Sequence, residues 1–292
     1  MHAEITLTNK SNDNRVITLV NTIKSPAGKV VDVVESQTEI SAGATVEVVV
    51  DMEVASPVRW DVENPAMYEL VTEVVGDDIL DTYSTPFGIR TFSFDVDKGF
   101  TLNGRNMKLL GVCMHHDMGA LGTTVHRRAL QRQLEVLRSF GVNAIRTSHN
   151  PPAPELLDLC DEMGFLVMDE AFDMWRRAKT KYDYARYFDE WHERDMADFV
   201  KRDRNHPSII MWSVGNEILE QWDNHNDTFE TLPTEQRNLL LNYLGQEENV
   251  EKTDEVNASM LLTRHMVATL KKYDNTRPVT AGCNETRPSN NL

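Results

Sequence analysis

Polar side chains in this sequence follow short apolar segments, and one of them is a carboxyl suited to proton transfer. The apolar segment IIMWSVGN ends at Asn216 and is followed directly by Glu217. A carboxyl beside Trp212 and apolar neighbours is expected to be partly desolvated, which favours its neutral form and raises its pKa. Such a group can donate a proton near neutral pH, so Glu217 is a candidate general acid. Taken alone, the motif is explained equally well by a helix cap or by an ion-paired carboxylate.

Two earlier apolar segments also end in groups that could bind a polar substrate. His115 follows one of them, and Arg146 and His149 lie at the end of the next. Imidazole and guanidinium groups are fixed hydrogen-bond donors, so these side chains could orient sugar hydroxyls or carboxyls. A lone histidine after a strand is more often structural, but two at matching strand ends favour substrate contact. The neighbours His116 and Asp117 are weaker candidates that could simply cap the following loop.

A metal site is a weaker alternative. Oxygen and nitrogen ligands that suit Mg²⁺ or Ca²⁺ fall within one short acidic window, at Glu170, Asp173, His192 and Glu193. They show no tight ligand spacing, so the sequence favours the absence of a bound metal.

The first ninety or so residues supply strands rather than chemistry. Segments rich in β-branched residues are separated by turn sequences such as NKSNDN, SPAG and SAGA, and they cover residues 4–9, 16–23, 29–34, 45–54, 67–75 and 80–94. Short strands with regular turns predict an immunoglobulin-like β-sandwich over residues 1–93. This part is interpreted as structural, without chemistry of its own.

From about residue 94 the pattern changes to alternating strands and helices. Apolar strands are expected at residues 108–112, 143–148, 165–170, 208–217 and 278–283, and helices at 127–141, 154–164, 195–204 and 260–274. This alternation, with continuously apolar strands, predicts a parallel sheet. Residues 94–292 are therefore expected to form the N-terminal part of a (β/α)8 TIM barrel, with five of the eight strands. Because the carboxyl ends of barrel strands meet at one mouth, the candidate residues should converge there, which favours Glu217 as an acid.

Composition excludes several classes of partner. The formal net charge of −16 argues against nucleic acid and anionic lipid, because both require clustered Lys and Arg. No segment approaches the ~20 apolar residues that cross a bilayer, and the first residues show no signal peptide. The sequence leaves the compartment open, either cytoplasmic or periplasmic. The three cysteines have no metal or disulfide spacing and are expected to be buried thiols.

Residues 87–122, 143–175 and 202–217 together resemble glycoside hydrolase family 2, and most closely its β-galactosidases. A weaker match covers TRPVTAGCN at residues 276–284. The family combines a jelly-roll domain, an immunoglobulin-like sandwich and a catalytic (β/α)8 barrel. The resemblance implies that Glu217 is the acid/base, that Asn216 contacts the sugar 2-hydroxyl, that His115 and His149 lie near the substrate, and that Arg146 lies near the acidic pair.

The sequence departs from the family pattern at two places. The family nucleophile is a Glu at the end of the seventh strand, and no residue here is assigned to that role; Glu285 is interpreted as a loop carboxylate. Some β-galactosidases bind Mg²⁺ through the acid/base and a Glu and a His just after the third strand. The matching positions here are Asp173 and Trp175, so no Mg²⁺ is expected.

The resemblance implies a hydrolase that cleaves terminal β-galactosides in two displacements with retention of configuration. The alternatives are a β-glucuronidase or β-mannosidase of the same family, or a non-catalytic carbohydrate-binding module. Without the nucleophile, the 292 residues alone are expected to have negligible activity. The unpaired edge of the last strand predicts either self-association into a homo-oligomer or a reorganised tail at residues 278–291.

Overall fold

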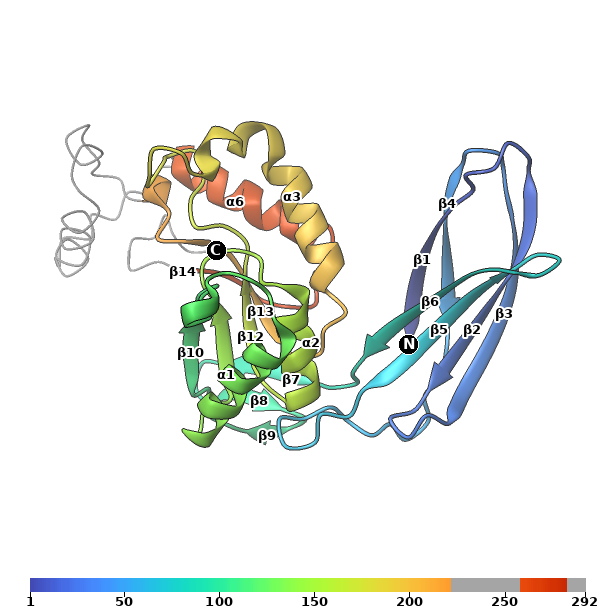
Figure 1. The fold of residues 1–292 in the computed structure, drawn as a ribbon, viewed down its shortest axis with the longest axis horizontal. Helices are drawn as coiled ribbons and strands as arrows, with labels where there is room; N and C mark the ends of the chain where they lie inside the picture. Colours follow the sequence, from blue (N-terminus) through green and yellow to red (C-terminus); the bar gives the residue numbers. More distant parts are fainter. Residues whose placement is uncertain (222–257, 283–292) are drawn as a thin grey trace, which may run out of the picture. The chain divides into compact units, whose positions relative to one another are not determined.

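The computed structural model describes residues 1–221 and 258–282 (Figure 1). They form two compact units. The first contains Met1–Lys108 with the short segments Asp161–Gly164 and Asn205–Pro207, and the second contains Leu109–Cys160, Phe165–Arg204 and the chain from Ser208 onward. Within the described ranges, every helix is too short or too polar to cross a lipid bilayer.

The first unit is a β-sandwich. A four-stranded antiparallel sheet has the order β3 (Val30–Ile40), β2 (Arg15–Lys24), β5 (Tyr68–Val75) and β6 (Ile79–Phe87), and β1 (His2–Thr8) pairs with β4 (Thr45–Asp51). Strand β2 buries alternate residues, and its Ile23 packs with Ala3 and Val50 of the two-stranded sheet. Because both sheets contribute to this core, the predicted sandwich is confirmed.

A small antiparallel sheet completes the first unit. It contains β7 (Phe92–Asp95), β8 (Gly99–Leu102) and β9 (Arg105–Asn106). Phe92, Phe94 and Phe100 form an aromatic group, with ring centroids 5.0–6.3 Å apart. Phe100 and Leu102 of β8 are buried, whereas Phe94 of β7 is partly exposed.

The second unit is built on a five-stranded parallel sheet. Its order is β10 (Gly111–Met114), β11 (Ala144–Thr147), β12 (Leu166–Glu170), β13 (Ile209–Asn216) and β14 (Val279–Gly282). The helices between these strands are α1 (Arg127–Ser139), α2 (Pro154–Met163), α3 (Phe188–Asp203) and α6 (Ala258–Lys271). Each strand pairs with the next one along the chain, as in a barrel, whereas a doubly wound sheet reverses its order. The predicted partial (β/α)8 barrel is confirmed.

Short 3-10 helices lie in the loops at the carboxyl ends of the strands, at η1 (Gly119–Leu121), η2 (Tyr184–Arg186) and η3 (Leu219–Gln221). Residue 283 and those after it lie outside the described residues. Three expectations therefore stay predictions. They are that Glu285 is a loop carboxylate, that the chain self-associates through the edge of its last strand, and that the tail at residues 278–291, most of which follows residue 282, is reorganised.

Several element boundaries differ from the sequence prediction, among them the starts of the first barrel strand and of the third helix. The first barrel strand was expected at residues 108–112, but pairing begins at Gly111 opposite Ala144. Before it, the backbone N–H of Leu110 donates to the Asn143 side chain instead, and the Leu110 side chain is exposed. The third helix begins at Phe188 rather than at residue 195, and acidic side chains in its first turn suit the positive end of the helix dipole.

Candidate active site

The centre of the site is a buried carboxylate at the end of β12. The Glu170 side chain has no exposed surface, and Arg146 of β11 binds it through Nη2 at 2.8 and 3.0 Å and through Nε at 3.1 Å. Ser213 Oγ donates to it at 2.7 Å, and His149 Nδ1 lies 2.8 Å away. Burial lowers the pKa of the Arg146 guanidinium, but the charge and hydrogen bonds of Glu170 outweigh this, so the pKa of Arg146 is raised and its charge is secure.

Asn216, the last residue of β13, continues this network. Its Oδ1 accepts from Arg146 Nη2 at 2.6 Å, and its Nδ2 donates to Asp173 Oδ1 at 3.0 Å. The ammonium of Lys179 donates to Asp173 Oδ1 and to the Asn216 backbone carbonyl, both at 2.7 Å. With a cation on one side and a carboxylate on the other, only one orientation of the Asn216 amide is compatible with its neighbours.

Glu217 directly follows this fixed asparagine. Its backbone has a φ of +44°, which is uncommon for a residue other than glycine, and its N–H donates to the carbonyl of Gly282 at 2.5 Å. The side chain is half-buried. Within residues 1–221 and 258–282, no hydrogen bond or ion pair engages the Glu217 carboxylate. The backbone of positive φ thus carries a carboxyl group that no described residue binds.

The prediction that Trp212 desolvates the carboxyl of Glu217 was wrong. Trp212 lies five residues before it, about 16 Å along an extended strand. The Trp212 indole is fully buried, donates to Asp274 Oδ2 at 2.8 Å and packs against Phe199 of α3. It therefore belongs to the layer between the sheet and the helices, and it does not surround the carboxyl of Glu217.

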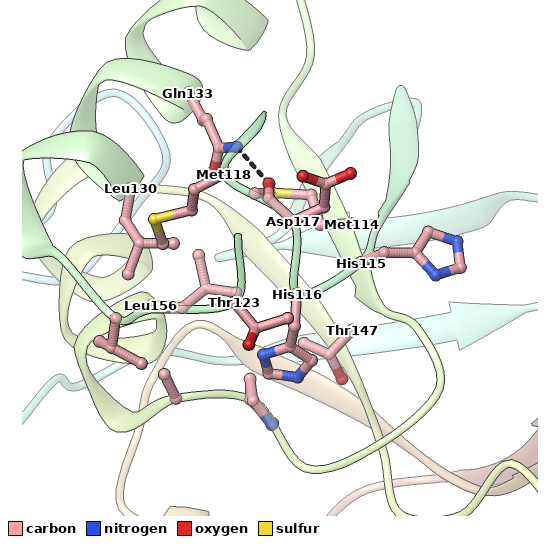
Figure 2. Close-up of a pocket in the computed structure, with 13 residues that line it drawn as sticks. Met114, His115, His116, Asp117, Met118, Thr123, Leu130, Gln133, Thr147 and Leu156 are labelled. Atoms are coloured by element: carbon pink, nitrogen blue, oxygen red, sulfur yellow. Dashed lines mark hydrogen bonds between the residues drawn. The ribbon is translucent and has the colours of Figure 1, made fainter. Parts of the chain in front are cut away.

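The two candidate histidines after β10 point in different directions. Figure 2 shows the His115 imidazole directed away from the apolar side chains of Met118 and Leu130, and the His116 imidazole directed toward the pocket. The ring of His115 meets that of His149 edge to face, with centroids 5.0 Å apart. His115 is thereby connected with the network around Glu170. Both His115 and His116 line the neighbouring pocket.

Asp117 has a local structural role at this pocket. Its Oδ1 accepts from the backbone N–H of Gly119 at 2.6 Å, and its backbone carbonyl accepts from Gln133 Nε2 of α1 at 2.8 Å (Figure 2). These contacts fix the loop after β10, which is the weaker of the two roles that the sequence suggested.

A cavity of about 320 Å³ opens beside Asp173. Aromatic side chains line it together with polar and charged ones, namely Phe172, Tyr184, Phe199, Asn150, Asp195, Asp198 and Arg202. Cavities with aromatic walls and a few polar groups are typical of small-molecule sites. The cavity shares Asp173 with the network, whereas Asn216 and Glu217 do not line it.

The residues after β12 do not fit a magnesium ion. Asp173 Oδ1 already accepts from the Lys179 ammonium and the Asn216 amide. The indole of Trp175 is fully buried and donates to the Val214 carbonyl at 3.0 Å, so it offers no ligand atom. The Lys179 ammonium supplies a positive charge beside Asp173 and the Asn216 carbonyl.

Sequence reasoning missed Lys179 and Ser213 as parts of the site, and it considered Glu170 only as a metal ligand. Glu170 ends a strand, as the other candidates do, so its position was a usable signal. Lys179 lies nine residues past the end of β12 in a loop, and no sequence pattern connects it with Asn216.

Comparisons with known proteins agree with this architecture. Residues 1–90 match the family model "Glycosyl hydrolases family 2", and residues 95–290 match "Glycosyl hydrolases family 2, TIM barrel domain". A β-galactosidase of Bacteroides ovatus is 52% identical over 288 residues, which cover 98% of this chain and 34% of that protein. A protein of Formosa agariphila named putative β-glucuronidase is 45% identical over 170 residues, 58% of this chain and 16% of that protein.

Solved structures give the same result. A glycosyl hydrolase family 2 member from Bacteroides cellulosilyticus superposes with a TM-score of 0.84 and 36% identity, covering 99% of this chain and 33% of that one. The chain thus spans about a third of the length of the Bacteroides relatives it matches.

Proposed function

Because the chain belongs to glycosyl hydrolase family 2, we propose that the protein containing it hydrolyses terminal β-galactosides with retention of configuration, and that Glu217 is its acid/base. The name of the Bacteroides ovatus relative supports galactose as the sugar. The Formosa agariphila relative supports a second candidate, β-glucuronidase activity. Under either proposal the ligand is a carbohydrate.

The observation that carries the proposal is the difference between three carboxylates near the ends of β12 and β13. Glu170 is bound by Arg146, Ser213 and His149, and Asp173 is bound by Lys179 and Asn216. Glu217 has no such partner among the described residues. A general acid must gain and lose a proton during each turnover, which suits a carboxyl without a permanent cation.

Under this proposal Glu217 donates a proton to the glycosidic oxygen and later removes one from the water that hydrolyses the glycosyl-enzyme. Asn216 is held between Arg146 and Asp173. Its amide keeps a second lone pair on Oδ1 and a second hydrogen on Nδ2, and these can bind a sugar hydroxyl. Retention requires a second carboxylate about 5–5.5 Å from the first. Glu170 is bound by Arg146, and Asp173 is bound by Lys179, so we assign the nucleophile to another carboxylate. We propose no metal in these steps, because the Lys179 ammonium already binds Asp173 Oδ1 and the Asn216 carbonyl.

The test is Glu217→Gln in the protein at its natural length. With 4-nitrophenyl β-D-galactoside, kcat should fall by about 10²–10⁴-fold, the usual contribution of general acid–base catalysis. A 2,4-dinitrophenyl galactoside, whose leaving group needs no proton, should lose far less in the step that forms the glycosyl-enzyme. Added azide should restore turnover and give the β-galactosyl azide. Unchanged kcat, or an α-azide product, would refute the assignment.

Glu220→Gln is the matched control. Burial raises the pKa of Glu220. Glutamine keeps the size of this side chain and can still accept the Arg177 backbone N–H that now lies 2.6 Å from Oε1. This variant should keep nearly full activity. Parallel assays with β-glucuronide and β-mannoside substrates distinguish the sugars. Absence of turnover on all three substrates would favour a non-catalytic carbohydrate-binding module.

A further inference from the structure

A second group of chemically active side chains lies between two helices, separate from the network around Glu170. His192 and Glu193 are on α3, and His265 is on α6. The Nε2 atoms of the two histidines are 3.2 Å apart, and Glu193 Oε1 lies 3.0 Å from His265 Nε2. Figure 1 shows α3 and α6 side by side, which brings together residues more than seventy positions apart in the sequence.

His192 is held in the orientation that a metal ligand requires. It is 8% exposed, its ring stacks on Phe188 at 4.5 Å, and its Nδ1 lies 2.6 Å from the Phe188 carbonyl. Since that carbonyl can only accept, Nδ1 carries the hydrogen, and Nε2 keeps its lone pair directed toward His265. Metal-ligating histidines are commonly fixed in this way by a backbone carbonyl behind the ring.

The spacing of the ligand atoms suits a small tetrahedral ion. With metal–nitrogen bonds of about 2.0–2.1 Å, neighbouring ligand atoms of a tetrahedral site lie roughly 3.3 Å apart. Two of the separations, 3.2 and 3.0 Å, are close to this value, and all three ligand atoms lie within 4.8 Å of one another. In addition, one hydrogen on His265 Nε2 cannot satisfy both His192 and Glu193, whereas a cation among the three atoms attracts all of them.

We propose that His192, Glu193 and His265 bind a zinc-class transition-metal ion that clips α3 to α6. Two imidazoles and one carboxylate suit Zn²⁺ or Co²⁺, whereas Mg²⁺ and Ca²⁺ prefer all-oxygen sites. A water molecule completes the coordination, since Glu193 and His265 are both partly exposed to solvent. The clip joins the helix that follows β12 to the helix that precedes β14, so its role is stabilisation, and the inference does not depend on the proposed glycosidase activity.

The test measures metal binding and stability rather than activity. Protein of natural length is first treated with a chelator and then titrated with Zn²⁺, with Mg²⁺ as a second titrant, at a pH where histidine is neutral. Zinc should bind with saturable 1:1 stoichiometry and raise the Tm, because an ion that binds only the native state stabilises it. Magnesium should do neither. Cobalt should give the visible absorption of a tetrahedral site.

Substitutions locate the ion. His265→Gln should weaken zinc binding by at least about 10-fold, the order of effect found even for residues that only support a metal ligand. Glu193→Gln changes an exposed side chain, so it should weaken zinc binding without disturbing the fold. It serves as the second variant. His126→Gln, at an exposed position before α1, is the matched control and should bind zinc like the wild type. The proposal is overturned if the wild type shows no saturable binding, or if the two ligand variants bind zinc as tightly as the control.

Discussion

Substitution of Arg146 by methionine tests how strongly the buried network depends on its cation. The change removes three hydrogen bonds to Glu170 and one to Asn216 while keeping an unbranched apolar side chain. Removing one partner of a buried ion pair typically costs about 3–5 kcal/mol, because the remaining charge is left uncompensated. The Arg146 side chain is 22% exposed, and Glu170 keeps Ser213 and His149. We therefore expect the lower end of that range, about 3 kcal/mol.

The measurement is urea unfolding followed by fluorescence of the buried tryptophans. Arg132→Met, at an exposed position on α1, is the control and should change the free energy of unfolding by no more than about 0.5 kcal/mol. The double variant Arg146→Met/Glu170→Gln should recover at least half of the loss, because the unpaired charge is gone. If Arg146→Met costs less than about 1 kcal/mol, or if the double variant recovers nothing, the carboxylate is not held by the guanidinium in the way described.

Three other substitutions test separate features. Burial and the nearby charge of Asp203 raise the pKa of Asp169, so the native protein loses stability as pH rises above the unfolded pKa of about 4. Asp169→Asn lacks this titration, and its free energy of unfolding should therefore increase relative to that of the wild type as pH rises above about 4 in pH-resolved unfolding. Gly164→Ala should destabilise by more than about 1 kcal/mol in urea unfolding, because φ is +72° and a Cβ would lie 2.4 Å from a carbonyl oxygen. Gly282→Ala should lower kcat in the galactoside assay, because its Cβ would lie 2.1 Å from Arg146 Nη2; unchanged kcat would show that the guanidinium can move without consequence.

The fold was predictable because its two parts have different periodicities. Alternating β-branched residues separated by turns gave the sandwich, and apolar strands alternating with amphipathic helices gave the parallel sheet. The start of β10 was less predictable. Leu109 and Leu110 have the composition of a strand, yet the pairing of Gly111 with Ala144 sets the register, and that contact is not visible in a local pattern.

The candidate site was predictable only where a side chain lies at the end of a strand. Arg146, His149 and Asn216 were expected to converge for this reason, and the structure brings all three to Glu170 or to one another. Lys179 reaches the network from a loop, and its contact with Asp173 depends on how that loop turns back. His265 joins its two partners only through the packing of α3 on α6. Such contacts depend on tertiary structure, which strand and helix periodicity does not encode.

The last described strand does more than extend the sheet. The Gly282 carbonyl accepts the N–H of Glu217, and the missing side chain of Gly282 leaves the space that the Arg146 guanidinium occupies. One glycine therefore fixes the backbone of the proposed acid/base and also permits the cation that holds Glu170. Because β14 pairs with β13, a displacement of this strand would alter both groups together. We infer that correct placement of β14, rather than formation of the four earlier strands alone, is what completes the geometry of this half of the site.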